Sequence, residues 1–121
     1  TLLAYGLMVN RALEAAELLH TEHGIEARVL KLNRIAPLDI ALFEPWFRGG
    51  EILAVPEDAF GAGCVGQRVS AILTEHGRCA GKLVLKNLGK TFAPEGSVSQ
   101  LEHSFGLDAA GIAAAVREAM G

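Results

Sequence analysis

The sequence predicts an α/β fold: a three-layer α/β/α sandwich around a mixed, mainly parallel sheet of about five strands. Short apolar runs alternate with amphipathic helical patterns along nearly the whole chain. Half of the residues are apolar but only 6% are aromatic, which favours an aliphatic core of helices packed on a sheet. A glycine-rich turn at residues 61–66 also joins an apolar run to a helical pattern, as in parallel sheets. The 121 residues fit one domain, 1–121.

The first elements are a strand, a helix and a second strand. Leu2 to Tyr5 is a buried strand that ends at Gly6. A helix begins at Met8, and Gly24 is placed to end it with a positive φ. The apolar face of this helix is formed by Val9, Ala12, Leu13, Ala16 and Leu19. Alternation from Ile25 to Leu32 predicts the second strand, and its polar half is typical of a sheet edge.

A connector and a short helix follow. Pro37 favours an extended conformation at the residue before it. Asp39 is a good N-cap for a helix over residues 40–47, which Pro45 should shorten or break. This stretch carries the aromatic side chains Phe43, Trp46 and Phe47. They are expected either in the core or on a contact surface.

The second half repeats the alternation of strand and helix. Ile52 to Val55 is a strand, and the helix after the glycine turn ends at Gly77. Its inward residues are Val65, Val69, Ile72 and Leu73, with Glu75 and Arg78 exposed. Lys82 to Leu88 is a fourth strand, and Val98 to Phe105 forms one or two helical turns. Asp108 caps a final helix whose apolar face holds Ile112, Ala115, Val116 and Ala119.

Charge and composition argue against several classes of protein. The net charge of −3 is spread without a basic stripe, so no nucleic-acid surface is expected. The run from Leu2 to Val9 is far shorter than the ~20 residues of a membrane span. Cys64 and Cys79 suggest reduced thiols rather than a disulfide scaffold, and no signal peptide is visible, so we expect a cytoplasmic protein. Because Thr1 already lies in a strand-like run, we expect a fragment of a longer chain.

The glycine turn spells a dinucleotide-binding motif, Gly61-x-Gly63-x-x-Gly66. That motif needs the first strand–helix unit and a carboxylate ~20 residues further on to hold a ribose. Here it follows the third strand, and the next strand ends without a carboxylate. Glu57 and Asp58 would also repel an anion. We therefore expect Gly63 and Gly66 to serve helix–sheet packing, with a nucleotide-binding module as the alternative.

The other polar groups make no clear active site. Glu57 and Asp58 are adjacent and should point to different sides, which favours a turn or interface role over acid–base catalysis. His20 and His23 are spaced to share a metal, but no cysteine or carboxylate completes a ligand set. The sequence thus predicts a domain with no catalytic and no metal-binding residue of its own.

Several motifs together resemble a known family. In chain order they are Tyr5-Gly6, Asn33-Arg34-Ile35-Ala36-Pro37-Leu38-Asp39, Val55-Pro56-Glu57-Asp58, the turn Gly63 to Gly66, and Phe105-Gly106-Leu107-Asp108-Ala109-Ala110-Gly111-Ile112. They resemble the C-terminal domain of transketolase-like enzymes, most of all the 1-deoxy-D-xylulose-5-phosphate synthases. Transketolases and the β subunits of 2-oxo acid dehydrogenases are the alternatives within the group.

The resemblance implies a division of labour between domains. Enzymes of this group bind thiamine diphosphate and Mg²⁺ in two other domains, and this chain lacks their Gly-Asp-Gly motif. The third domain is expected to pack on the pyrimidine-binding domain of the same chain and to help build a homodimer. Arg34, Asp39, Trp46, Glu57 and Asp58 are the candidates for turn or interface roles. The fragment alone is expected to be inactive.

Overall fold

The computed structural model describes residues 1–39, 41, 50–59, 61–78, 80–89 and 96–121. Within these residues the sheet has four strands in the order β2-β1-β3-β4, and every neighbouring pair is parallel. The strands are β1 (Leu2–Ala4), β2 (Val29–Lys31), β3 (Ile52–Pro56) and β4 (Lys82–Lys86). The predicted mainly parallel sheet is confirmed; among the described residues it is wholly parallel rather than mixed, with four strands in place of about five.

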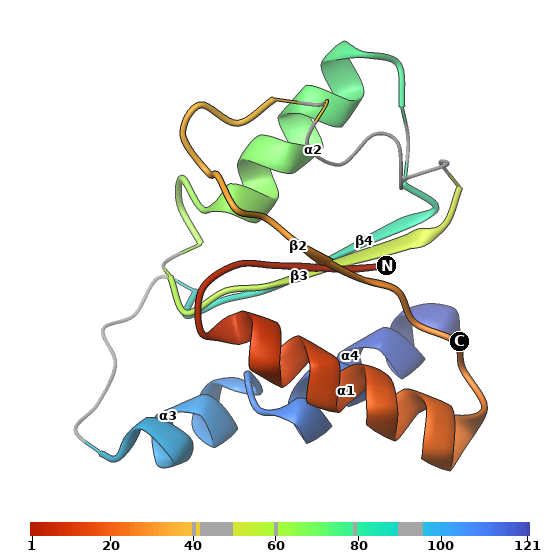
Figure 1. The fold of residues 1–121 in the computed structure, drawn as a ribbon, viewed down its shortest axis with the longest axis vertical. Helices are drawn as coiled ribbons and strands as arrows, with labels where there is room; N and C mark the ends of the chain where they lie inside the picture. The colour runs from red at the N-terminus through yellow and green to blue at the C-terminus, as the bar shows by residue number, and fades with distance from the viewer. Residues whose placement is uncertain (40, 42–49, 60, 79, 90–95) are drawn as a thin grey trace.

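The helices cover both faces of this sheet. They are α1 (Met8–His23), α2 (Val65–Glu75), α3 (Val98–Phe105) and α4 (Ala109–Met120). Figure 1 shows α2 on one side of the strands and α1, α3 and α4 on the other. The predicted three-layer α/β/α arrangement is therefore confirmed.

Alternate residues of the strands point to the two helical layers. Leu2 and Ala4 of β1 lie in the core cluster under α1 and α4, whereas Leu3 lies in the cluster under α2. Ala54 and its neighbour Val55 divide in the same way. This period of two is what a strand buried on both faces requires.

The second strand is shorter than predicted, and the end of α1 explains why. Gly24 ends the helix with φ 64°, as expected. The next amide, that of Ile25, still donates to Leu19 O at 3.0 Å and so belongs to the helix cap. Residues 25–28 are then irregular, and pairing with β1 begins at Val29.

The buried face of α1 also differs from the prediction. The fully buried residues are Met8, Ala12, Ala15 and Leu19. They are spaced four, three and four apart, which keeps them on one side of the helix. Leu13 lies off this line and is 52% exposed, so its predicted place in the core was wrong.

Most of the remaining predicted elements are found. On α2, Val65, Val69 and Leu73 are buried, and on α4 Ile112 and Val116 are buried. Asp39 accepts a hydrogen bond from the amide of Ala41 at 3.1 Å, as a cap would. The predicted helix that follows it, with Phe43, Pro45, Trp46 and Phe47, lies outside the described residues, as does Cys79. In the part of the chain that is described, no helix combines the length and the apolar character needed to cross a membrane.

Candidate functional site

A buried carboxylate lies at the carboxyl end of β3, where parallel α/β sheets place function. Glu57 follows this strand directly, and none of its surface is exposed. Its Oε1 accepts hydrogen bonds from the amide of Val65 at 2.8 Å and from the Tyr5 hydroxyl at 2.9 Å. Its Oε2 accepts one from the amide of Gly66 at 2.9 Å. One side chain therefore joins β1, β3 and the first turn of α2.

Local structure positions this carboxylate. The amide of Glu57 donates to Lys86 O at 2.7 Å, which keeps the residue in register with β4 beyond the end of β3. Residue Cys64 stands at the N-cap of α2 but makes no side-chain cap hydrogen bond. Glu57 takes over that task, because it accepts from two of the amides that a helix start leaves unpaired. Its negative charge also faces the positive end of the helix dipole.

The glycines of the turn have different roles. A Cβ built on Gly66 would lie 2.6 Å from Leu85 Cδ2, 3.1 Å from Glu57 Oε2 and 3.3 Å from Val55 Cβ. Gly66 therefore serves close helix–sheet packing, as predicted. Gly63 has φ 72° and open space at its Cβ position, so its role is conformational, and the packing role predicted for it was wrong. A Cβ on Gly61 would lie 3.2 Å from Asn87 Oδ1.

The surroundings of Glu57 suppress ionisation of its neighbours. Burial raises the pKa of Tyr5, and the hydrogen bond to Glu57 raises it further, so the phenol stays a donor. Burial also raises the pKa of the Cys64 thiol, and the nearby Glu57 adds to the shift. A reactive cysteine needs the opposite shift. Cys64 is a free thiol and only 4% of its surface is exposed.

This geometry leaves the Gly61-x-Gly63-x-x-Gly66 turn without the free backbone amides that a dinucleotide-binding motif uses. A bound pyrophosphate would need the free amides at the start of α2. Two of these amides already donate to Glu57, whose charge would repel a phosphate. Repulsion of an anion by Glu57 was predicted from the sequence, but its burial and its capping role were not. The available signal was Cys64 at the cap position, where a Ser, Thr, Asp or Asn is expected.

The other candidate residues do not gather around Glu57. Asp58 is exposed while Glu57 is buried, so the two adjacent carboxylates point apart as predicted. Arg34 and Asp39 are exposed in the connector after β2. Trp46 lies outside the described residues.

The histidines lie at the surface near helix ends. His20 Nδ1 is 2.6 Å from Glu26 Oε1, and His23 Nε2 is 3.8 Å from Glu22 Oε2. A glutamate thus lies beside each of these two histidines, although no nearby carboxylate was expected from the sequence. Even so, the described residues contain no group of three His, Cys, Asp or Glu side chains arranged to hold a metal ion.

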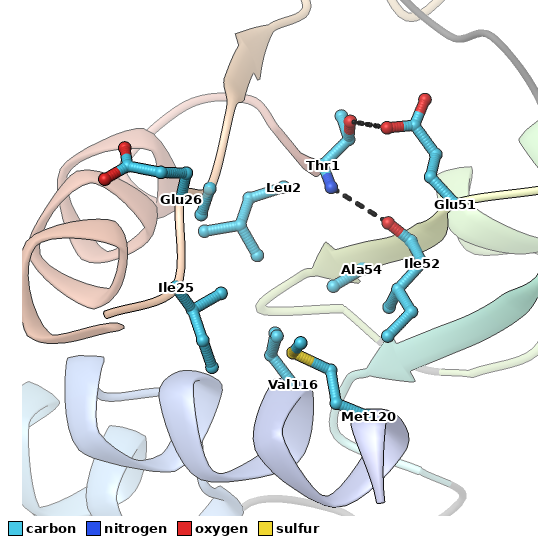
Figure 2. A pocket seen from close by; sticks show the side chains of 10 residues that line it. Thr1, Leu2, Ile25, Glu26, Glu51, Ile52, Ala54, Val116 and Met120 are labelled. Atoms are coloured by element: carbon cyan, nitrogen blue, oxygen red, sulfur yellow. Dashed lines mark hydrogen bonds between the residues drawn. The ribbon is translucent and has the colours of Figure 1, made fainter. Parts of the chain in front are cut away.

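A hollow of about 200 Å³ opens at the opposite, amino edge of the sheet. Figure 2 shows the starts of β1 and β3 meeting the end of α4 around it, with Leu2, Val116 and Met120 in its wall. Both of its carboxylates have partners: Glu51 accepts from the Thr1 hydroxyl at 3.0 Å, and Glu26 contacts His20. We assign this hollow no ligand.

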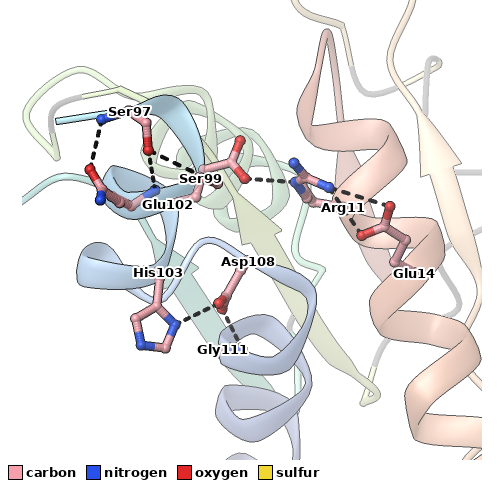
Figure 3. Close-up of polar contacts among 9 residues, drawn as sticks. Arg11, Glu14, Ser97, Ser99, Glu102, His103, Asp108 and Gly111 are labelled. Atoms are coloured by element: carbon pink, nitrogen blue, oxygen red, sulfur yellow. Dashed lines mark hydrogen bonds and ion pairs between the residues drawn. The ribbon is translucent and has the colours of Figure 1, made fainter.

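Polar side chains also tie α3 to its neighbours (Figure 3). Ser97 and Gln100 form a reciprocal capping box at the start of α3. At its other end, His103 Nδ1 lies 2.8 Å from Asp108 Oδ2, and Asp108 Oδ1 accepts from the amide of Gly111 at 2.9 Å. Asp108 is therefore the predicted N-cap of α4, and it also connects that helix to α3.

This contact predicts a dependence of stability on pH. The hydrogen bond from His103 lowers the pKa of Asp108 below its ordinary 3.8. A lowered folded-state pKa stabilises the fold above pH 3.8, and this stabilisation is lost as the pH falls through the folded value. We expect Asp108→Asn, which keeps a capping oxygen, to lower the free energy of unfolding by about 1 kcal/mol at pH 7. Urea titrations should show this difference vanishing in acid; a difference that persists below the folded pKa would contradict the assignment.

The hydrogen bonds of Glu57 thus stabilise the packing of an α/β/α domain. Comparison with known proteins shows which family this chain belongs to. The chain belongs to the family described as "Transketolase, C-terminal domain", which matches residues 1–112. It is 35% identical to the 1-deoxy-D-xylulose-5-phosphate synthase of Aromatoleum aromaticum, a match covering 96% of this chain and 18% of the synthase. The synthase of Thioalkalivibrio sulfidiphilus is 38% identical, covering 96% of this chain and 17% of that protein.

Two further similarities extend across the wider group. The 2-oxoisovalerate dehydrogenase subunit beta of Bacillus subtilis is 42% identical over 63% of this chain and 23% of its own length. A solved structure described as a split-gene transketolase, an inactive β4 tetramer, superposes with a TM-score of 0.81 at 30% identity. That match covers 98% of this chain and 37% of the transketolase chain. The chain spans less than a fifth of the synthases that it matches.

Proposed function

We propose that this chain acts as the C-terminal domain of a thiamine-diphosphate-dependent transferase, a 1-deoxy-D-xylulose-5-phosphate synthase. The whole enzyme would act in the cytoplasm and join pyruvate and glyceraldehyde 3-phosphate, with release of CO₂. The product, deoxyxylulose 5-phosphate, is a precursor for isoprenoid synthesis. The domain's own part is architectural: it packs on the pyrimidine-binding domain and helps organise a homodimer. The observation that carries the proposal is the similarity to synthases over 96% or more of the chain.

The site geometry supports a structural role for this domain. The residues described here do not fit thiamine diphosphate, because Glu57 occupies the amides that a diphosphate would use. They also hold no cluster of ligands for Mg²⁺. We therefore assign both cofactors to other domains of the enzyme.

The test is an assay of the full-length gene product. With pyruvate and glyceraldehyde 3-phosphate we expect release of CO₂ and formation of deoxyxylulose 5-phosphate, both dependent on added thiamine diphosphate and Mg²⁺. Residues 1–121 alone should give neither product. If the full-length protein instead transfers two-carbon units from ketose phosphates, the synthase proposal fails and a transketolase replaces it.

A second candidate is the C-terminal domain of a 2-oxo acid dehydrogenase β subunit. It is favoured by the 42% identity to the Bacillus subtilis subunit, although that match covers only 63% of this chain. Reductive acylation of lipoamide by the full-length protein, together with binding to an acyltransferase core, would support this candidate over the synthase.

A further inference from the structure

Helix α3 is less embedded in the domain than the other three helices described above. It alone among the four has no fully buried residue, and it packs on no strand or helix as extensively as α4 packs on α1. Within α3 only Leu101, Glu102 and Phe105 are partly buried, and the other residues are exposed. With 8 residues it is also too short to be stable as an isolated helix in water. Its order therefore depends on how it is attached.

The C-terminal end of α3 is firmly attached. Gly106 ends the helix with φ 69°, and the next residue, Leu107, is only 1% exposed. The amide of Leu107 donates to Glu102 O at 2.7 Å, and that of Gly106 donates to His103 O at 3.1 Å. Lys86 Nζ lies 2.8 Å from the Cβ position built on Gly106, which places a positive charge at the negative end of the helix dipole. This end of α3 is held by the core.

An ion pair fastens the middle of α3 to α1. Arg11 Nε lies 2.7 Å from Glu102 Oε2 of α3, and Arg11 Nη1 lies 3.2 Å from Glu14 Oε2 of α1 itself (Figure 3). The Glu102 side chain is 12% exposed and that of Glu14 is 54% exposed. The pair with Glu102 is therefore better shielded from water and from salt than the pair with Glu14.

Close packing does not replace this ion pair. A hollow of about 210 Å³ lies between α3 and the residues that follow β3 and β4, with Asp58 at its edge. Its apolar lining consists of Leu88, Val98, Leu101, Phe105 and Leu107. Protein interiors leave few voids larger than a water molecule, and side chains around such a void lose part of their dispersion contacts. Helix α3 thus covers apolar side chains without packing tightly against them.

We propose that α3 is a strap, hinged at Gly106 and latched by the Arg11–Glu102 ion pair, that opens as a unit while α1, α4 and the sheet stay folded. Opening uncovers the apolar side chains around the hollow, such as Leu88. Because the latch is electrostatic, salt or an anion that competes for Arg11 shifts the strap toward its open state. The strap is a property of this domain and does not depend on which reaction the full-length enzyme catalyses.

The test is amide hydrogen exchange of the full-length protein, expressed as protection factors. We expect the amides of residues 101–105 to be at least about 100-fold less protected than the central amides of α1 and α4, because a local opening requires less free energy than global unfolding. In about 1 M salt, where the screening length falls to about 3 Å, protection of α3 should drop roughly threefold. Protection of α1 and α4 should not change.

Two matched variants each remove one carboxylate from Arg11. Glu102→Gln breaks the latch, so we expect protection of residues 101–105 to fall about fivefold and to lose most of its salt dependence. Glu14→Gln removes the exposed carboxylate, which belongs to α1, and should leave protection of α3 unchanged. Exchange in α1 and α4, measured in the same samples, shows whether each variant is folded.

Two results would overturn the strap proposal. One is a protection of α3 equal to that of α1 and α4, because α3 would then open only when the whole domain unfolds. The other is an equal effect of Glu102→Gln and Glu14→Gln on α3, including no effect of either, because the pair between Arg11 and Glu102 would then not be the latch.

Discussion

Glu57→Gln is expected to lower the free energy of unfolding by about 2 kcal/mol. The buried carboxylate accepts three hydrogen bonds and donates none. A glutamine side chain must place its NH₂ group, which cannot accept a hydrogen bond, at the position of either Oε1 or Oε2. If that position is Oε2, the amide of Gly66 loses its acceptor; if it is Oε1, Val65 and Tyr5 lose theirs. Urea unfolding followed by circular dichroism measures the difference.

Tyr5→Phe is the matched control for this prediction, because it removes one of the three donors and keeps the ring. We expect a smaller loss of about 1 kcal/mol. In the double variant the two losses should not add, since both act on the same carboxylate. A Glu57→Gln variant as stable as the wild type would show that the carboxylate does not hold the start of α2.

Gly111→Ala should destabilise the fold more, by about 3 kcal/mol. A Cβ at this position would lie 2.5 Å from Gly106 O and 2.6 Å from Gly106 C. These are backbone atoms at the end of α3, so they cannot move aside as a flexible side chain can. The clash outweighs the ~1 kcal/mol that alanine contributes over glycine inside a helix. The melting temperature should fall accordingly.

Gly63→Ala separates backbone strain from overlap. Its Cβ would meet no atom within 4 Å, so only the positive φ of 72° opposes the change. We expect a loss of about 1 kcal/mol. If Gly111→Ala instead raised the melting temperature, as helix propensity alone predicts, the close contact between the end of α3 and the start of α4 would be wrong.

The order of strands and helices could be predicted because periodicity and caps agree along most of the chain. Asp108 marks the start of α4, and Gly24 marks the end of α1. The predictions failed where two local rules competed. The alternation after Gly24 indicated a strand from Ile25, but the amide of Ile25 donates to Leu19 O and is part of the helix cap. Leu13 was placed on the apolar face of α1 by its helical spacing, but the buried line runs through Met8, Ala12, Ala15 and Leu19 and leaves Leu13 exposed.

The candidate site was harder to predict than the fold. The sequence located the glycine turn and separated Glu57 from Asp58, both correctly. Whether a carboxylate at the end of a strand turns outward or inward depends on the register with the neighbouring strand, here the bond from the Glu57 amide to Lys86 O. A single sequence does not contain that register. The role of Tyr5, 52 residues away along the chain, depends on strand order in the same way.

The most direct test of the central claim follows the amides of Val65 and Gly66 in a ¹⁵N-labelled protein during titration with NADH and with thiamine diphosphate. The account predicts that neither resonance shifts at millimolar ligand, because both amides donate to Glu57. Saturable shifts at these two amides would contradict it and would make the glycine turn a ligand site.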